Sequence, residues 1–192
     1  MVAVTRKKLF TIDEYHKLVD IGFFTENDRI ELIRGEIIEM APKRTPHSVC
    51  NSTLFGELYK ILGEKANVRG QEPVTLPFNS EPETDVVIAR KKDDNYLSAH
   101  PTVEDIILVI EISDSTLKYD RETKMSLYAE SGINNYWIVN LIDRNLEVYT
   151  NPFTVDKDKF GYRNRITMLP SEAIKIPGFT DIDLKLSLIF PQ

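Results

Sequence analysis

The chain has 192 residues, of which 42% are hydrophobic and 28% charged, a composition typical of one folded domain with a sizeable core. Its formal net charge of -6 argues against a protein that coats nucleic acid non-specifically, because such binding depends on Lys and Arg. Cys50 is the only cysteine, which excludes an intrachain disulfide and a cysteine-rich zinc site and is typical of a cytoplasmic protein.

The charge does not exclude an enzyme that binds a metal ion, because the carboxylates that hold the metal themselves lower the net charge. No apolar run reaches the roughly 18 residues that a membrane helix needs, and the N-terminus lacks the pattern of a signal peptide. We therefore expect a soluble protein with no membrane partner. A flexible N-terminus over residues 1–9 should precede a single domain over residues 10–192.

Local signals define the first helix and a hairpin. Thr11 followed three residues later by Glu14 is a capping box, which predicts a helix that begins near Thr11 and ends at Gly22. Apolar runs on either side of Arg34-Gly35 predict a tight β-hairpin formed by residues 29–33 and 36–40.

Predicted strands dominate the middle of the chain. Helical spacing of apolar residues predicts one more helix over residues 46–64, with His47 in its first turn. The run over residues 105–112 is continuous and rich in β-branched residues, which predicts a central strand covered on both faces. A polar loop at residues 90–100 precedes it. Further strands are predicted at residues 68–69, 74–77 and 85–89.

The C-terminal part continues this mixture of elements. Residues 119–131 are expected to form a helix that ends at Gly132. Strands are then predicted at residues 136–141, 146–149, 161–169 and 173–176, followed by a helical or irregular piece at residues 184–190. Helices and strands in this order predict an α/β (α+β) fold with a mixed sheet.

Two acidic residues stand at the ends of the most apolar predicted strands. Asp85 begins one strand and Glu111 lies near the end of the next, 26 positions later. If these strands are antiparallel neighbours, the two carboxylates meet, and two hard oxygen ligands suit Mg²⁺ or Mn²⁺. The alternative is that Asp85 is a turn residue and Glu111 is paired with a basic side chain in the core.

A lysine follows on the next predicted helix. Spacing of four places Asp120, Lys124 and Tyr128 on one helical face. A lysine directed at the carboxylate pair could orient or deprotonate an attacking water and offset negative charge on a phosphate. The alternative is an ordinary salt bridge between Lys124 and Asp120.

Hydroxyl and imidazole groups near these positions have two interpretations each. Ser113 begins a hydroxyl-rich loop that could cap the following helix or donate hydrogen bonds to phosphate. His47 could take part in catalysis or be a surface or structural residue. Neither belongs to a visible nucleophile motif, and no phosphate-binding glycine fingerprint is present in the sequence.

Considered together and in order, several segments resemble the Uma2 family, within the PD-(D/E)XK nuclease superfamily. The resemblance covers residues 10–152 and depends on the order and spacing of the segments. They are Arg29-Ile30-Glu31-Leu32-Ile33-Arg34-Gly35-Glu36-Ile37, His47, Pro82-Glu83-Thr84-Asp85-Val86-Val87, Val109-Ile110-Glu111-Ile112-Ser113-Asp114-Ser115-Thr116, Asp120 with Lys124 and Tyr128, and Gly132-Ile133-Asn134-Asn135-Tyr136-Trp137-Ile138-Val139.

The resemblance implies a restriction-endonuclease-like fold, in which helices flank a central mixed β-sheet with a Mg²⁺-dependent phosphodiesterase site at its edge. Asp85 and Glu111 match the acidic residues of the superfamily motif, as metal ligands. The expected substrate is nucleic acid, in particular DNA. Asp85 and Glu111 would hold Mg²⁺ (or Mn²⁺), and Lys124 would position the attacking water.

The chain departs from the family pattern at one position. The motif's lysine should stand two residues after Glu111, where this sequence has Ser113. In some members of the superfamily the lysine has moved to the neighbouring helix, and Lys124 is placed for that. Glu31 is either a further ligand or a supporting acidic group, or else the cross-strand partner of an arginine such as Arg29 or Arg34.

Two other functions remain open at this point. The first is a catalytically inactive nuclease-fold module that binds nucleic acid or protein, which the displaced lysine favours. The second is an interaction protein that forms a homodimer through strand edges, with Tyr136, Trp137 and Tyr149 as candidate interface aromatics, although Trp137, within a continuous apolar strand, fits the core better.

Overall fold

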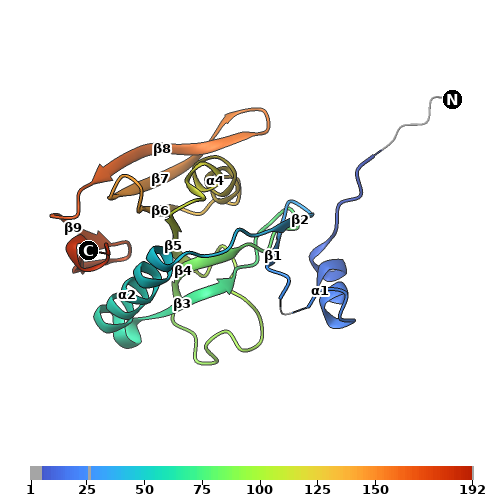
Figure 1. Ribbon diagram of the computed structural model, residues 1–192, viewed down its shortest axis with the longest axis horizontal. Coiled ribbons are helices and arrows are strands. Elements are labelled where there is room, and N and C mark those ends of the chain that lie inside the picture. Colours follow the sequence, from blue (N-terminus) through green and yellow to red (C-terminus); the bar gives the residue numbers. More distant parts are fainter. Residues whose placement is uncertain (1–5, 26, 192) are drawn as a thin grey trace.

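A six-stranded mixed sheet organises the computed structural model, which describes residues 6–25 and 27–191 (Figure 1). Its strand order is β3-β4-β5-β6-β7-β8. The strands are β3 (Ala66–Pro73), β4 (Glu83–Arg90), β5 (Ile106–Ser113), β6 (Asn135–Asn140), β7 (Asn145–Asp156) and β8 (Lys159–Met168). Neighbouring strands are antiparallel except β5 and β6, which are parallel and therefore need a crossover connection.

Helical segments and two small hairpins surround this sheet. The helical segments are α1 (Ile12–Asp20), α2 (Thr45–Leu62), the short turn η1 (Gly63–Lys65), α3 (Leu117–Tyr119), the π-helical η2 (Asp120–Lys124), α4 (Met125–Glu130) and the short turn η3 (Leu186–Leu188). The hairpins pair β1 (Ile30–Ile33) with β2 (Glu36–Glu39), and β9 (Ala173–Ile176) with β10 (Phe179–Lys185). The crossover from β5 to β6 consists of α3, η2 and α4, which form one continuous helical stretch.

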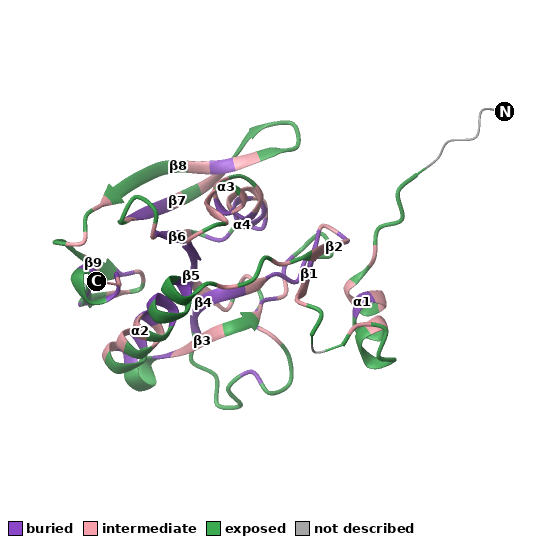
Figure 2. Ribbon diagram, viewed as in Figure 1, coloured by how far each residue is buried: buried purple, intermediate pink, exposed green. Residues whose placement is uncertain are grey.

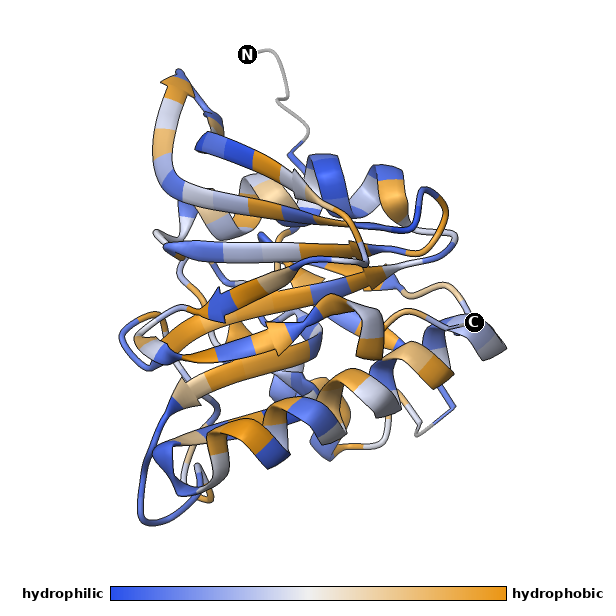
Figure 3. Ribbon diagram, turned by 90° about the vertical axis from the view of Figure 1, so that its left-hand side faces the viewer, coloured by the Kyte–Doolittle hydropathy of each residue, from blue (hydrophilic) through white to orange (hydrophobic). Residues whose placement is uncertain are grey.

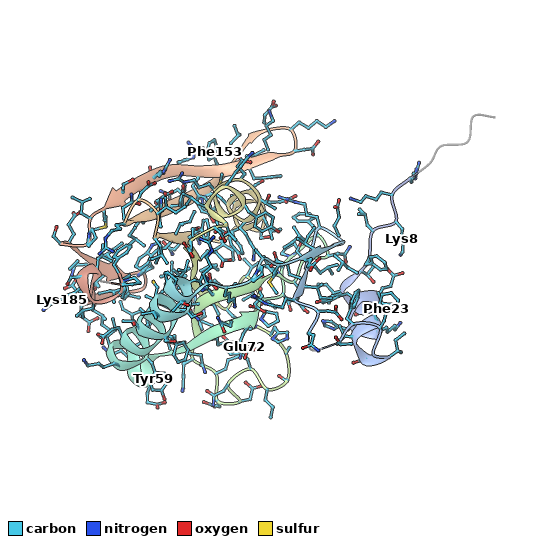
Figure 4. The ribbon with its side chains drawn as sticks, viewed as in Figure 1. Lys8, Phe23, Tyr59, Glu72, Phe153 and Lys185 are labelled. Carbon is cyan, nitrogen blue, oxygen red and sulfur yellow. The ribbon has the colours of Figure 1, made fainter. Side chains whose placement is uncertain are left out.

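Successive residues of β4 and β5 alternate between two hydrophobic layers. Val86 and Ile110 lie in the layer that includes Leu54 and Leu58 of α2, whereas Val87 lies in the layer beneath α4. Burial of both sheet faces explains the continuous apolar runs in these strands. Figure 2 shows the buried middle strands, and Figure 3 shows hydrophobic residues concentrated along them. On the outer side of α2, Tyr59 points away from the sheet (Figure 4).

Most predicted elements are confirmed, with shifts of one to a few residues at their ends. The capping box is present, because the Thr11 hydroxyl accepts from Glu14 N–H and the Glu14 carboxylate accepts from Thr11 N–H. The hairpin turns at Arg34 and Gly35, which have φ of 49° and 77°. A Cβ on Gly35 would lie 2.9 Å from the Phe10 carbonyl oxygen, so both the φ and the contact require glycine.

One predicted element is wrong, and another begins two residues later than predicted. Residues 74–77 form no strand: Phe78 and Asn79 adopt positive φ and return the chain, so that only Leu76 bridges to Ser80. The segment at residues 184–190 was expected to be helical or irregular from its start, but β10 continues to Lys185 before η3 begins. Its pairing with β9 is a tertiary contact that the local pattern does not encode.

β7 is also longer than predicted and contains Pro152. Pairing with β6 ends at Thr150, so Pro152 pairs only with Tyr162 of β8. Beyond Thr150 the strand needs hydrogen-bond donors on one side only, which allows proline at that position.

The remaining expectations concern the chain's ends and surfaces. Residues 1–5 of the predicted flexible N-terminus lie outside the described residues, whereas Phe10 N–H already donates to Gly35 O at 2.8 Å. Tyr136, Trp137 and Tyr149 are buried in the chain's own core, so they do not form a dimer surface. The homodimer itself stays a prediction. Within residues 6–25 and 27–191, no helix combines the length and the hydropathy needed to span a membrane.

Candidate functional site

Asp85 and Glu111 lie side by side where β4 begins and β5 ends. Val86 pairs with Ile110 in the antiparallel register, which places the two acidic residues at the next position along the ladder. Asp85 N–H donates to Glu111 Oε2 at 3.2 Å. Both residues are buried, with 8% of Asp85 and 4% of Glu111 exposed. The antiparallel arrangement that the metal hypothesis requires is therefore present.

Asp85 is held as a carboxylate by two hydrogen bonds. Its Oδ2 accepts from Ile112 N–H at 2.8 Å and lies 3.0 Å from His47 Nε2. Burial alone would raise the pKa of Asp85, but the hydrogen bonds and the nearby imidazole outweigh it, so this pKa is lowered. Asp85 thus keeps a negative charge available in the interior.

Glu111 is in the opposite electrostatic situation. Its Oε1 accepts from Tyr128 OH at 2.6 Å and lies 3.4 Å from Lys124 Nζ. Burial raises the pKa of Glu111 to about 8, and the negative charges of Asp85 and Asp120 add to this effect while Lys124 opposes it. The ammonium group of Lys124 does not outweigh the effect of burial, so a further cation bound at Glu111 would be needed to favour its ionised form.

Lys124 points into the site from the crossover helix. Its Nζ donates to Glu31 Oε2 at 2.7 Å and to Glu83 O at 2.8 Å. Burial would lower the pKa of Lys124, but Glu111 and Glu31 outweigh it, so the pKa is raised and the ammonium stays charged. The ion-pair partners of Lys124 are Glu31 and Glu111, so the alternative of a salt bridge with Asp120 is wrong.

The π-helical segment η2 sets the direction of these side chains. In a regular α-helix, residues four apart drift by about 40° around the axis, because each turn holds 3.6 residues. The wider turn at Asp120–Lys124 offsets this drift, and Asp120, Lys124 and Tyr128 are all buried toward the sheet. Single π turns of this type are frequent at functional sites.

An ionic network fixes η2 against the sheet. Arg121 of η2 and Arg165 of β8 both bind the carboxylate of Glu147, which is fully buried on β7. Tyr149 OH donates to the same carboxylate at 2.6 Å. Because the network joins η2 to two strands, it limits movement of the segment that contains Lys124.

Glu31 forms the inner wall of the site. Its Oε1 accepts from Tyr119 OH at 3.1 Å, and its Oε2 accepts from Glu83 N–H at 3.2 Å in addition to Lys124. The alternative of an arginine partner is wrong: Arg34 binds Glu130, and Arg29 binds the Ala41 carbonyl. The contacts of Glu31 are those of a group that positions Lys124.

The hydroxyl-rich loop at residues 113–116 donates hydrogen bonds to the carboxylate of Asp120. Ser113 Oγ and Thr116 Oγ1 each donate to Asp120 Oδ2 at 2.6 Å. Burial raises the pKa of Asp120, although both hydroxyls oppose the shift. The two alternatives for Ser113 were capping of the helix backbone and donation to phosphate. In this structure its hydroxyl donates to the Asp120 side chain instead.

His47 lies in the first turn of α2, as predicted, and only 8% of it is exposed, so it is not a surface residue. Its Nε2 faces Asp85, whereas Nδ1 is buried without a hydrogen-bond partner among the described residues. The geometry makes it a group that orients Asp85.

These groups open into a cleft of about 330 Å³ between the β1–β2 hairpin, the start of α2 and the crossover helix. Lys43, Glu83 and Tyr119 also line the cleft, although none of them was a candidate site residue from the sequence. Glu83 could have been found from the sequence, because it lies two positions before Asp85 and alternate residues of a strand point to the same face. Lys43 and Tyr119 gave no signal, because only tertiary structure brings them to the carboxylates.

The donor set is compatible with a divalent cation. Four carboxylates in the site are buried (Glu31, Asp85, Glu111 and Asp120), whereas Lys124 is the one buried lysine or arginine among the described residues. Such an excess of buried negative charge is costly unless a cation or protons compensate it. Asp85 and Glu111 could hold Mg²⁺ or Mn²⁺ through oxygen, with water or substrate at the other positions. No cluster of three or more acidic, His or Cys side chains arranged for a metal occurs in the described part of the chain.

Comparisons with known proteins identify the family and the fold of the chain. Residues 12–186 match the model of the Uma2 family, described as "Putative restriction endonuclease". The structure is also similar to the 1.96 Å crystal structure of "a putative nuclease belonging to DUF820" from Anabaena variabilis ATCC 29413, with a TM-score of 0.70 and 17% identity over 94% of this chain and 97% of that chain. At this identity the similarity shows a shared fold, and it confirms the predicted fold class. No curated protein matches the chain.

Proposed function

The chain belongs to the Uma2 family, and from this premise we propose that it is a Mg²⁺-dependent endonuclease that hydrolyses phosphodiester bonds of DNA. The observation that supports this most is the arrangement of Asp85, Glu111 and Lys124. Two buried carboxylates on neighbouring strands lie beside a buried ammonium group, and all three line one open cleft.

Asp85 and Glu111 are the residues that would hold Mg²⁺ (or Mn²⁺). When bound, the metal would polarise the phosphate and lower the pKa of a coordinated water. Asp85 enters this role already ionised, whereas Glu111 must lose its proton, because its pKa is raised. His47, Ile112 N–H and Tyr128 orient the two carboxylates through hydrogen bonds.

Lys124 would orient the attacking water and offset the negative charge that develops on the phosphate. Its raised pKa keeps it protonated, so it acts as a hydrogen-bond donor and not as a base. An ammonium has three N–H groups, and Glu31 and Glu83 O occupy two of them. The third is available beside Glu111, where a water bound between the carboxylates would lie.

The inactive-module alternative loses its main support. It was favoured because the lysine expected at position 113 is displaced to position 124. The Nζ of Lys124 nevertheless lies 3.4 Å from Glu111 Oε1, a distance suited to the role of the missing lysine.

The test is cleavage of supercoiled plasmid DNA by purified protein with Mg²⁺, compared with the same reaction in EDTA. Asp85→Asn keeps the size of the side chain and removes its charge, so we expect nicking to disappear. Asp93→Asn is the matched control, because Asp93 is exposed in the loop after β4 and should behave as wild type. Equal nicking by Asp85→Asn and wild type, purified in parallel, would overturn the proposal.

A further inference from the structure

Lys43 is a second ammonium group beside the candidate metal ligands. It lies in the irregular segment over residues 40–44, between β2 and α2. Its Nζ donates to Glu83 Oε1 at 2.8 Å and lies 3.9 Å from Asp85 Oδ1. The Lys43 side chain is 21% exposed, compared with 6% for Lys124. Lys43 therefore lies on the solvent side of the carboxylates, and Lys124 lies on their inner side.

The two lysines also differ in their freedom to change partners. Lys124 makes two hydrogen bonds in the interior, to Glu31 and to the Glu83 carbonyl. Lys43 makes one hydrogen bond among the described residues, so two of its N–H groups are left for another acceptor. Its partner Glu83 is 26% exposed, so water can solvate that carboxylate when Lys43 exchanges this ion pair for a new one.

A phosphodiester that enters this cleft meets mostly negative charge. The carboxyl groups of Glu31, Glu83, Asp85, Glu111 and Asp120 all line it. An anion can approach such a surface only where cations offset the repulsion. Lys43 is next to Asp85 at the open side, and Arg29 and Arg44 line the same cleft.

We propose that Lys43 binds a non-bridging oxygen of the substrate phosphate, exchanging its contact with Glu83 for one with the substrate. This inference rests on the proposed function, because it assigns a substrate contact at the same site. Lys43 thus contacts the incoming phosphate, whereas Lys124 orients the attacking water.

The test is binding of a short DNA duplex in Ca²⁺, followed by fluorescence anisotropy over a range of salt concentrations, with a gel to verify that the duplex stays intact. We expect Lys43→Met to weaken binding about equally for duplexes of different sequence. It should also reduce the magnitude of the slope of log K, where K is the association constant for DNA, against the logarithm of the salt concentration by about 1. Lys43→Arg should retain most of the affinity. Lys60→Met is the matched control, because Lys60 is 75% exposed on α2 and does not line the cleft.

A second measurement separates loss of a phosphate contact from a folding defect. Calorimetry with Mn²⁺ should show that Lys43→Met binds the metal as tightly as wild type or more tightly, since a positive charge 3.9 Å from Asp85 has been removed. Weaker Mn²⁺ binding by this variant, or a DNA affinity and salt slope equal to those of wild type, would overturn the role of Lys43.

The two proposals can fail separately. If wild type binds DNA through Lys43 but does not cleave it with Mg²⁺, the nuclease proposal fails and the assignment of Lys43 as a phosphate contact stands. If wild type cleaves DNA and Lys43→Met binds it equally well, only the Lys43 assignment fails. If wild type does not bind DNA, the Lys43 assignment also fails.

Discussion

Glu31 of β1 and Lys124 of η2 form a buried ion pair, with 2.7 Å between Oε2 and Nζ, although 93 positions separate them in the sequence. The pair joins the β1–β2 hairpin to the crossover helix, on the buried side of the candidate ligands Asp85 and Glu111. Because Lys124 also contacts Glu111, the position of the hairpin determines where the ammonium group lies in the site.

Removal of Glu31 should therefore destabilise the protein as well as the site. Glu31→Ala leaves Lys124 without its closest counter-ion, and breaking a buried pair in this way costs about 3–5 kcal/mol in the free energy of unfolding. Urea unfolding monitored by circular dichroism measures this loss. The control is Glu57→Ala, whose partner Lys60 is 75% exposed, and it should change stability by about 0–1 kcal/mol. A similar small change for Glu31→Ala would show that the pair is not buried as described.

Stability of the metal-free protein should fall as the pH rises from 5 toward 8. The folded-state pKa of Glu111 is raised from its ordinary value of 4.5 to about 8, so the native state retains a proton that the unfolded state releases. In this interval the free energy of unfolding decreases with pH, by at most about 1.4 kcal/mol per pH unit for one group. Urea midpoints at several pH values in EDTA measure the slope.

Glu111→Gln is the control for that dependence. Glutamine has a similar shape and does not titrate, so the slope should become shallower while Asp120, whose pKa is also raised, retains its share. An unchanged slope in Glu111→Gln would contradict the assignment of the proton to Glu111.

Loss of the Tyr128 hydroxyl should shift the pH at which the site binds metal. Tyr128 OH donates to Glu111 Oε1 at 2.6 Å and lowers the pKa of that carboxyl. Tyr128→Phe should therefore raise the pKa of Glu111, and the pH at which Mn²⁺ affinity reaches its maximum should move upward, because the metal displaces the proton. Calorimetric titrations at a series of pH values provide the readout. Tyr59→Phe, at an exposed position of α2, should leave the profile in place; an identical shift in both variants would exclude a specific role for Tyr128.

The sequence predicted those parts of the structure that local pattern determines. Continuous apolar runs indicated β4 and β5, and an acidic residue at an end of each run indicated the carboxylate pair. Spacing of four indicated that Asp120, Lys124 and Tyr128 share a helical face, although the π turn that aligns them was not predictable from that spacing.

The partners of these residues depended on tertiary structure and could not be predicted. Glu31 meets Lys124 only because the hairpin and the crossover helix converge. Lys43 belongs to a segment without regular structure, and no periodicity marks it. The pairing of β9 with β10 likewise joins segments whose own sequences favour no particular register.

If Asp85 and Glu111 together hold a divalent cation, a crystal structure with Mn²⁺, measured at a wavelength where manganese scatters anomalously, should reveal the ion. We expect one anomalous peak in the cleft, within coordination distance of a carboxylate oxygen of each residue, and no such peak in crystals of Asp85→Asn grown in the same way. A cleft without a peak at saturating Mn²⁺, or a peak that persists in Asp85→Asn, would contradict binding of the cation by these two residues.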